Sequence, residues 1–375
     1  MVKILTYNQI DQAQWQALVN QSPTATWFQT PEAYKFYASV NEMMPFAVGV
    51  VESQECDSEA MGNGQWAIGK ETSGAVTSAH TPKLKGVIVG YITKEKNPIK
   101  QLLTGRAIII GGPLLAEDIS ATALAALLKA VKAMDNGQWA IGEENNRQSP
   151  IANRPIYIES RNFHDYSKWK SIFETNGYAY QPHLNFHVDC MQENMLATMS
   201  ESRRRQIKKA IKSGVEIIEA QSQDDVIAYY EILKDLYINK VKTPLFPVEF
   251  FLSFFDNSFG KYLLVKYEGK IIGGIMCPIL KARTIYEWFV CGLDEQYKNQ
   301  YPSVMATYAA IEYANSNNIS CFDFMGAGKP DEAYGVRDFK ARFGGEMVEY
   351  GRYLCVRKPL LYNIGKLGVK LLKKR

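Results

Sequence analysis

The segment CFDFMGAGKPDEAYGVRDFKARFGG, residues 321–345, holds the turn on which the interpretation of the fold depends. Its middle, GAGKPDE, invites comparison with a phosphate-binding loop. Such a loop needs G-x-x-x-x-G-K-[ST], because backbone amides wrap the phosphates and the hydroxyl binds magnesium. Here Pro330 follows Gly328 and Lys329, and Asp323 stands where the first glycine belongs. The segment therefore predicts a strand over 321–324, a turn and a helix starting near Gly335, rather than an ATP site.

The charge of this 375-residue chain is nearly balanced but unevenly placed. There are 43 basic and 39 acidic residues, a formal net charge of +4, and 46% of the residues are hydrophobic. Residues 350–375 contain eight Lys or Arg and no acid, and residues 200–214 contain six and one Glu. This asymmetry indicates an anionic partner.

The remaining composition argues against several classes of protein. The six cysteines are scattered without a C-x-x-C pair, which is typical of a reducing cytosol. His183 and His187 are four apart, but no Cys or acidic ligand pattern accompanies them, so we predict no metal site. The first residues lack the apolar region of a signal peptide, and no run approaches eighteen apolar residues. We expect a cytoplasmic protein.

Capping and periodicity signals predict alternating helices and strands. Thr30-Pro31, Ser200 and Ser222 are expected to begin helices, and Gly214 to end one. From residue 191 the predicted order is α-β-α-α-β-β-β-α-β-α-β, with single strands over 284–292 and 347–356. The half before 191 has a weaker version of the same order. We therefore predict an α/β (α+β) fold of two related units, with mixed central sheets flanked by helices.

Two polar stretches, near 53–82 and 135–153, interrupt the first unit. Each contains the heptapeptide NGQWAIG, at 63–69 and at 136–142. A functional repeat would occupy equivalent places, whereas these copies lie in one strand-to-strand and one helix-to-strand connection. Insertion into mobile surface loops is favoured over a binding motif, because lengthening a loop costs little entropy.

Several segments in order resemble the FemABX peptidyl/aminoacyl transferases and their GNAT-like acetyltransferase relatives. They are WFQTPEAYKFY, IIIGGPLL, RRRQIKKAIKSGVEI, YEILKDLY, EGKIIGG, EQYKNQYPSVMATYAAIEYA and FDFMGAG…GVRDFKARFGG. The resemblance covers nearly the full chain apart from the insertions. It implies two GNAT-like domains, an N-terminal one over 1–190, completed by 347–375, and a C-terminal one over 191–346.

The resemblance also implies a reaction and its residues. Family members move an aminoacyl group from a tRNA ester to an amine of a peptidoglycan precursor, with no cofactor. The lysine matching Lys340, beside Phe339, contacts the aminoacyl-tRNA end, so we assign these two residues as catalytic. A cation beside the reacting oxygen stabilises the oxyanion of the tetrahedral intermediate. From the residues alone, a solvated helix lysine remains an alternative.

Further candidates concern the substrates. Basic side chains on the predicted helix over 200–214 could meet tRNA or a pyrophosphate, although a solvated helix face is equally compatible. After the next long helix, where the resemblance implies an arginine that contacts the precursor, this chain offers only Lys240 or Lys242. The acceptor implied is a lipid-linked or UDP-linked muropeptide. The tail PLLYNIGKLGVKLLKKR could touch the inner face of an anionic membrane, or form a packed terminal helix. The substrate-binding candidates are Lys35, Arg203, Arg204, Lys208, Lys240, Lys242 and Asp323.

Two other functions stay open. One is an N-acyltransferase that uses acyl-CoA or another acyl carrier and acts on a cell-surface glycan, lipid or small molecule. An acyl-CoA enzyme would need a glycine-rich turn to cradle the CoA pyrophosphate, whereas other acyl carriers would not. The matching place, YKNQYPSVM at 297–305, has no glycine, and Pro302 removes one amide donor. A degenerate, non-catalytic binding protein is the other alternative, and the intact Phe339-Lys340 pair argues against it.

Overall fold

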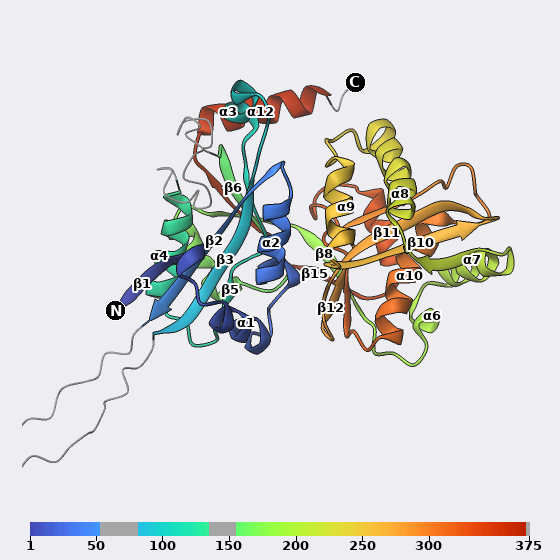
Figure 1. The fold of residues 1–375 in the computed structure, drawn as a ribbon, viewed down its shortest axis with the longest axis horizontal. Coiled ribbons are helices and arrows are strands. Elements are labelled where there is room, and N and C mark those ends of the chain that lie inside the picture. The colour runs from blue at the N-terminus through green and yellow to red at the C-terminus, as the bar shows by residue number, and fades with distance from the viewer. Residues whose placement is uncertain (53–81, 135–154, 373–375) are drawn as a thin grey trace, which may run out of the picture.

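The computed structural model describes residues 1–52, 82–134 and 155–372. Both copies of NGQWAIG lie outside these ranges. Within them the strands form two mixed sheets of eight strands each, lying side by side with helices on their faces (Figure 1). The predicted α/β class with two helix-flanked mixed sheets is confirmed.

The first sheet is built mainly from the amino-terminal part of the chain. Only its β4–β6 pair is parallel, and the other described pairs are antiparallel. The short strand β5 (Leu114–Leu115) pairs with β3 beside the main path. The order along that path is β1 (Val2–Thr6), β2 (Met43–Glu52), β3 (Lys83–Thr93), β4 (Ala107–Gly111), β6 (Tyr157–Asn162), β16 (Arg352–Val356) and β7 (Ala179–Gln181).

The second sheet repeats this plan. Its one parallel pair among the described strands is β12–β14, and β13 (Phe289–Gly292) pairs with β11 beside the main path. The order is β15 (Glu346–Glu349), β8 (Leu184–Asp189), β14 (Cys321–Asp323), β12 (Thr284–Tyr286), β11 (Lys270–Leu280), β10 (Gly260–Tyr267) and β9 (Glu216–Glu219).

The two sheets exchange strands. β8 follows β7 in sequence but pairs with β14 and β15 of the second sheet, whereas β16 follows β15 but pairs with β6 and β7 of the first. The predicted single strand over 347–356 is therefore wrong: the chain changes sheets at Gly351, whose φ of +62° a side chain rarely adopts. The division into 1–190 and 191–346 remains our proposal. The pairing puts the first change of sheet at 182–183.

Helices cover both faces of each sheet. In the first unit α4 lies on one face, and α1 and α2 lie on the face toward the second unit (Figure 1). In the second unit α8 and α9 lie toward the first unit, and α7 and α10 cover the opposite face. The helices are α1 (Gln12–Gln21), α2 (Pro31–Ser39), α3 (Pro98–Thr104), α4 (Ala121–Lys132), α5 (Lys170–Thr175), α6 (Met195–Thr198), α7 (Glu201–Lys212), α8 (Gln223–Leu236), α9 (Val248–Asp256), α10 (Pro302–Ser316), α11 (Gly335–Ala341) and α12 (Pro359–Leu372).

The predicted capping residues begin their helices. Ser200 accepts a hydrogen bond from the amide of Arg203 at α7, and Ser222 caps α8. Thr30 caps α2 ahead of Pro31. Each cap satisfies an amide that the first helical turn leaves unpaired.

A shared aromatic core joins the two units. Trp27, Phe28 and Phe36 of the first unit pack against rings of the second, and Trp288 lies with its ring centroid 5.1 Å from that of Phe28. Phe254 lies 5.5 Å from Phe36, measured between ring centroids. Edge-to-face contacts of this kind add to the free energy of burial. This core fixes the two sheets relative to each other and so sets the width of the space between them.

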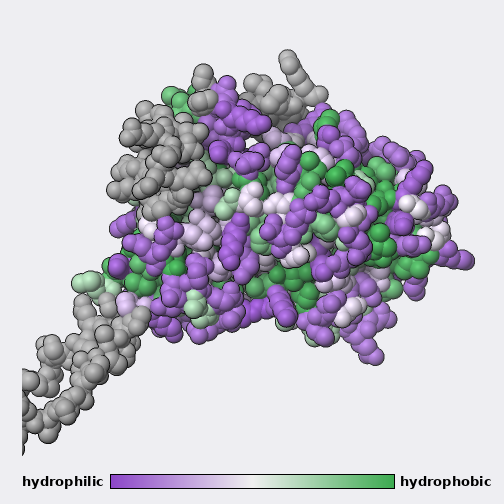
Figure 2. Space-filling model, viewed as in Figure 1, coloured by the Kyte–Doolittle hydropathy of each residue, from purple (hydrophilic) through white to green (hydrophobic). Residues whose placement is uncertain are grey.

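The visible surface of the protein is mainly hydrophilic (Figure 2). Figure 2 shows hydrophilic side chains over most of the visible face, with smaller hydrophobic areas between them. No helix in the described part of the chain is long and apolar enough to span a bilayer. The five described cysteines are free thiols, and the described residues contain no group of three or more His, Cys, Asp or Glu suited to a metal ion.

Candidate active site

A cavity of about 700 Å³ lies between the two units. Strands β3, β4, β6 and β16 form one wall, and the segment after α8, the β12–β13 connection and α11 form the other. Its charged lining residues are Glu42, Lys94, Glu95, Lys100, Arg106, Arg161, Glu287, Lys340 and Arg352. The six basic and three acidic side chains of this lining favour an anionic ligand over a cationic one.

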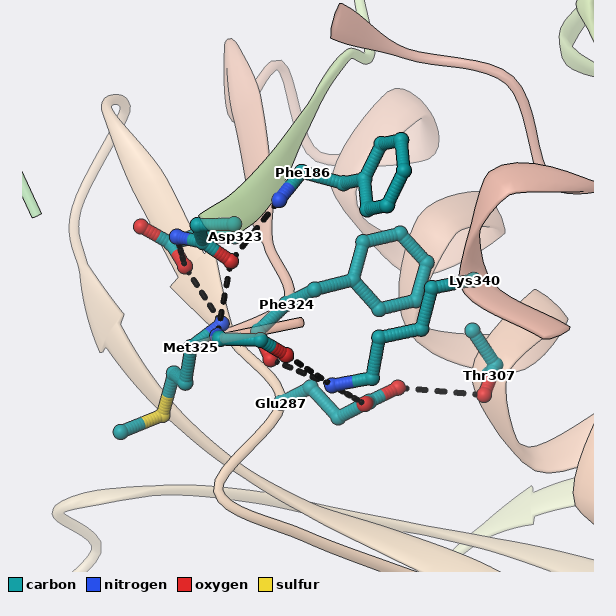
Figure 3. Close-up of polar contacts among 9 residues, drawn as sticks. Phe186, Glu287, Thr307, Asp323, Phe324, Met325 and Lys340 are labelled. Atoms are coloured by element: carbon teal, nitrogen blue, oxygen red, sulfur yellow. Dashed lines mark hydrogen bonds and ion pairs between the residues drawn. The ribbon is translucent and has the colours of Figure 1, made fainter. Parts of the chain in front are cut away.

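Lys340 lies in the last turn of α11 at the wall of this cavity, with its side chain 10% exposed. Its ammonium donates to the backbone oxygens of Phe324, at 2.8 Å, and Gly326, at 2.9 Å. It also forms an ion pair with Oε1 of Glu287 at 2.9 Å (Figure 3). An ammonium has three N–H donors, so these three acceptors fix the group in one orientation.

Glu287 supplies the counter-charge from a break between two strands. The sequence predicted one strand over 284–292, which is wrong: β12 ends at Tyr286 and β13 begins at Phe289. The amide of Glu287 bonds to the backbone oxygen of Asp323 at 2.9 Å, so its carboxylate turns inward. Oε2 accepts from the Thr307 hydroxyl at 3.2 Å. Burial raises the pKa of Glu287 above its ordinary value, and the Lys340 ammonium opposes this.

The glycine-rich turn presents carbonyls rather than amides. The amides of Met325 and Gly326 donate to the side chains of Asp323 and Asn185, and that of Ala327 donates to a backbone oxygen. Its carbonyls bind cations from α11. The Lys340 ammonium donates to two backbone carbonyl oxygens, as described above. Arg337 donates to the backbone oxygens of Ala327, at 3.0 Å, and of Lys329. A phosphate cradle needs free amides, so this turn instead holds α11 and its lysine.

Arg203 is buried behind α11, the helix that carries Lys340. The residue is 2% exposed, and its guanidinium lies 4.5 Å and 4.2 Å from the ring centroids of Phe339 and Phe343. It donates to the backbone oxygen of Phe339 at 2.8 Å and to Gln206. Burial lowers its pKa to about 10. This placement favours a role in positioning α11 over the predicted contact with substrate.

Asp323 also lies inside the protein, 2% exposed. Its carboxylate pairs with Nε2 of His187 at 3.0 Å and accepts from Asn185 at 2.7 Å. Burial acts to raise the pKa of Asp323, but the His187 charge and these hydrogen bonds outweigh it and lower the pKa. Asp323 therefore fixes the end of β14, from which the backbone continues to the Lys340 acceptors.

The remaining candidates lie away from the cavity lining. Lys35 on α2, Lys208 on α7 and Lys242 are exposed. Lys240 pairs with Glu295 at 2.7 Å, and Arg204 donates to the backbone oxygen of Met199 at 2.8 Å. Of the nine candidates, only Phe339 and Lys340 line the cavity.

Sequence reasoning missed Glu287 and the arginines of the first sheet. The signal for Glu287 was a single acid in the apolar run TIYEWFVCG, where a buried charge requires a partner. For Arg161 and Arg352 no local signal existed, because β6 and β16 are far apart in sequence and meet only through the strand exchange.

Comparison with known proteins gives a family match over part of the chain and a shared fold over nearly all of it. Residues 279–370, which include β12, α10 and the Lys340 helix, match the FemAB family. The solved structure of FemX superimposes with a TM-score of 0.63 at 13% identity, covering 96% of this chain and 99% of that one. This segment is similar to the FemAB family, and the chain as a whole shares the fold of FemX.

Other solved structures extend the likeness in fold to tandem GNAT proteins. A tandem GNAT protein of the clavulanic acid biosynthesis pathway has a TM-score of 0.52 at 8% identity, covering 94% of this chain and 98% of that one. A conserved protein of unknown function from Bacteroides thetaiotaomicron VPI-5482 has a TM-score of 0.51 at 8% identity, covering 95% and 100%. No curated protein sequence matches the chain. The FemAB match indicates an enzyme, an aminoacyl- or acyltransferase.

Proposed function

We propose that this enzyme transfers an aminoacyl group from aminoacyl-tRNA to an amine of a peptidoglycan precursor. The observation that carries the proposal is the Lys340–Glu287 pair on the wall of a basic cavity between the two units. The lipid-linked or UDP-linked muropeptide is the acceptor class that we favour. The likeness to FemX, and the family of the matched segment, support this reaction class.

In the proposed reaction the neutral acceptor amine attacks the ester carbonyl carbon of the charged tRNA. A C–N bond forms and the carbonyl oxygen becomes an oxyanion. The C–O bond to the ribose then breaks, and the leaving ribose oxygen takes up the proton that the amine releases. Lys340 stabilises the oxyanion by exchanging one of its backbone acceptors for this oxygen, an interaction worth about 3 kcal/mol in related sites.

The Lys340–Glu287 pair suits this role because the carboxylate keeps the ammonium in place. Glu287 holds the ammonium from one side, and the backbone oxygens of Phe324 and Gly326 hold it from the other. Glu287 therefore keeps the ammonium near the oxyanion while one backbone acceptor is exchanged, which limits the reorganisation that the step requires.

The cavity rim offers cations for the tRNA backbone. Arg106 and Lys94 are exposed beside the opening, and Lys100 on α3 pairs with Glu95 at 2.7 Å. Contacts of such side chains with phosphates are weakened by salt. On the same side α12 exposes Leu360 and Ile364, which supports peripheral contact with a membrane that carries a lipid-linked acceptor.

One observation argues against an acyl-CoA donor. In GNAT-type enzymes the CoA pyrophosphate binds at a helix amino terminus, and here that terminus belongs to α10. The Ser303 amide at its start already donates to Oδ1 of Asp294 at 3.1 Å, and the Ser303 hydroxyl bonds to Oδ2 of the same carboxylate. An acid at this place repels a pyrophosphate.

The donor is tested by radiolabel transfer. Purified enzyme is incubated with a muropeptide precursor and either charged tRNA or labelled acetyl-CoA. We expect label from the charged tRNA to appear on the precursor. Transfer from acetyl-CoA alone would replace this proposal with the N-acyltransferase alternative.

A further inference from the structure

A pair of arginines on the first sheet faces the cavity without a matching pair of acids. Arg161 on β6 lies directly opposite Arg352 on β16 in the strand register. Both line the cavity. Like charges directly opposite each other destabilise a sheet, so this arrangement needs anionic neighbours.

A single carboxylate, that of Glu159, supplies negative charge to both arginines. Glu159 bonds to Nε of Arg161 at 2.8 Å through Oε2 and to NH1 of Arg352 at 3.0 Å through Oε1. Two cations and one anion leave the trio with a net positive charge. NH2 of Arg352 bonds to Nε2 of His183 at 2.9 Å, and burial together with Arg352 lowers the pKa of His183 to about 4, so this ring is neutral.

The terminal nitrogens of Arg161 are the available donors. A guanidinium has five N–H groups, and only Nε of Arg161 is taken up by Glu159 among its bonds to the described residues. Its side chain is 34% exposed, toward the cavity. Glu159 holds the stem of the guanidinium and so orients the fork. Tyr91 and Arg106 line the same wall beside it.

We propose that Arg161, held by Glu159 and backed by Arg352, binds an oxyanion group of the acceptor, a carboxylate or a phosphate, across the cavity from Lys340. A planar fork matches both groups with two parallel hydrogen bonds. That the bound molecule is the acceptor rests on the proposed function. That Arg161 binds an anionic group rests on the geometry of the cavity wall alone. This site differs from the basic residues that the sequence suggested, none of which shares this wall.

The experiment measures binding to the full chain by calorimetry, without any tRNA. The phosphate probe is uridine diphosphate, compared with uridine. The carboxylate probe is N-acetyl-D-alanyl-D-alanine, compared with its carboxamide. We expect one anionic probe to bind better than its uncharged partner, and Arg161→Gln to weaken that binding about tenfold or more. The probe that binds identifies the source of the oxyanion.

Two further variants keep the test specific. Arg161→Lys keeps the charge beside Glu159 but lacks the fork, so we expect weakened binding with an unchanged melting temperature. Arg205→Gln removes an exposed arginine of α7, with a side chain 74% exposed, and should leave binding unchanged. Equal binding of charged and uncharged probes, or wild-type affinity in both Arg161 variants, would overturn the site. Arg161-dependent binding without transfer from tRNA would overturn the proposed function and leave the site standing.

Discussion

The ammonium of Lys340 lies 2.9 Å from the carboxylate of Glu287, and both side chains are nearly buried, at 10% and 3% exposed. A buried ion pair is costly to break, because the remaining charge has no partner. The two residues come from different elements, α11 and the β12–β13 connection. Their contact therefore links the position of α11 to the sheet.

This pair predicts strong coupling between the two residues. Lys340→Met should lower the free energy of unfolding by about 3 kcal/mol, because Glu287 is left buried without its counter-charge. Lys340→Met combined with Glu287→Leu should lose less than the sum of the two single changes. Urea unfolding of the four proteins measures this. Simple additivity would mean that the two groups do not interact.

Arg203 should support activity without touching substrate. Arg203→Met removes its bonds to Phe339 and Gln206, so we expect a loss of about 2 kcal/mol in stability and a lower kcat with little change in KM. The matched control is Arg205→Met, two positions along α7 and exposed. A raised KM with unchanged stability would instead assign Arg203 to substrate binding.

The shifted pKa values of three histidines predict how the stability of the protein changes with pH. Burial lowers the pKa of His164 and of His183 to about 4, so between pH 6.5 and 4 the unfolded chain binds protons there that the folded chain does not. Stability contributed by these two rings is lost as the pH falls through that window. Asp323 raises the pKa of His187 against the opposing effect of burial, so its contribution is instead lost as the pH rises through the folded value.

The measurement is urea unfolding at pH 7 and pH 5, with imidazole signals followed by NMR. His183→Gln should reduce the loss of stability at pH 5, and His187→Gln should increase it. A pKa of 6.5 for His183, its ordinary value, would contradict the buried position described for this ring beside Arg352.

Gly351 should be needed for the change of sheet. Its φ is +62°, and a Cβ there would come 2.4 Å from the Tyr180 ring. We expect Gly351→Ala to cost about 2 kcal/mol in stability. Gly214 also has a positive φ, +92°, but no atom lies within 4 Å of its added Cβ, so Gly214→Ala should cost about 1 kcal/mol. Equal losses would remove the steric reason for a glycine at 351.

The sequence revealed the elements better than their connections. Caps at Ser200 and Ser222 and the turn after β14 were predicted because they depend on neighbouring residues. The interruption of the strand at Glu287 and the change of sheet at Gly351 were not predicted, because each depends on pairing with strands that are distant in sequence. The same limit applies to the site. Lys340 was found through the resemblance, whereas its partner Glu287, and Arg161 with Arg352, meet only in the folded chain.

The central claim is that the Lys340 ammonium stabilises the oxyanion formed during aminoacyl transfer. The most direct measurement is the single-turnover rate of transfer from charged tRNA to the precursor, in the wild type and in Lys340→Met at a temperature where both are folded. We expect a rate lower by about a hundredfold in the variant, with binding of the charged tRNA retained. An unchanged rate in the folded variant would contradict the claim.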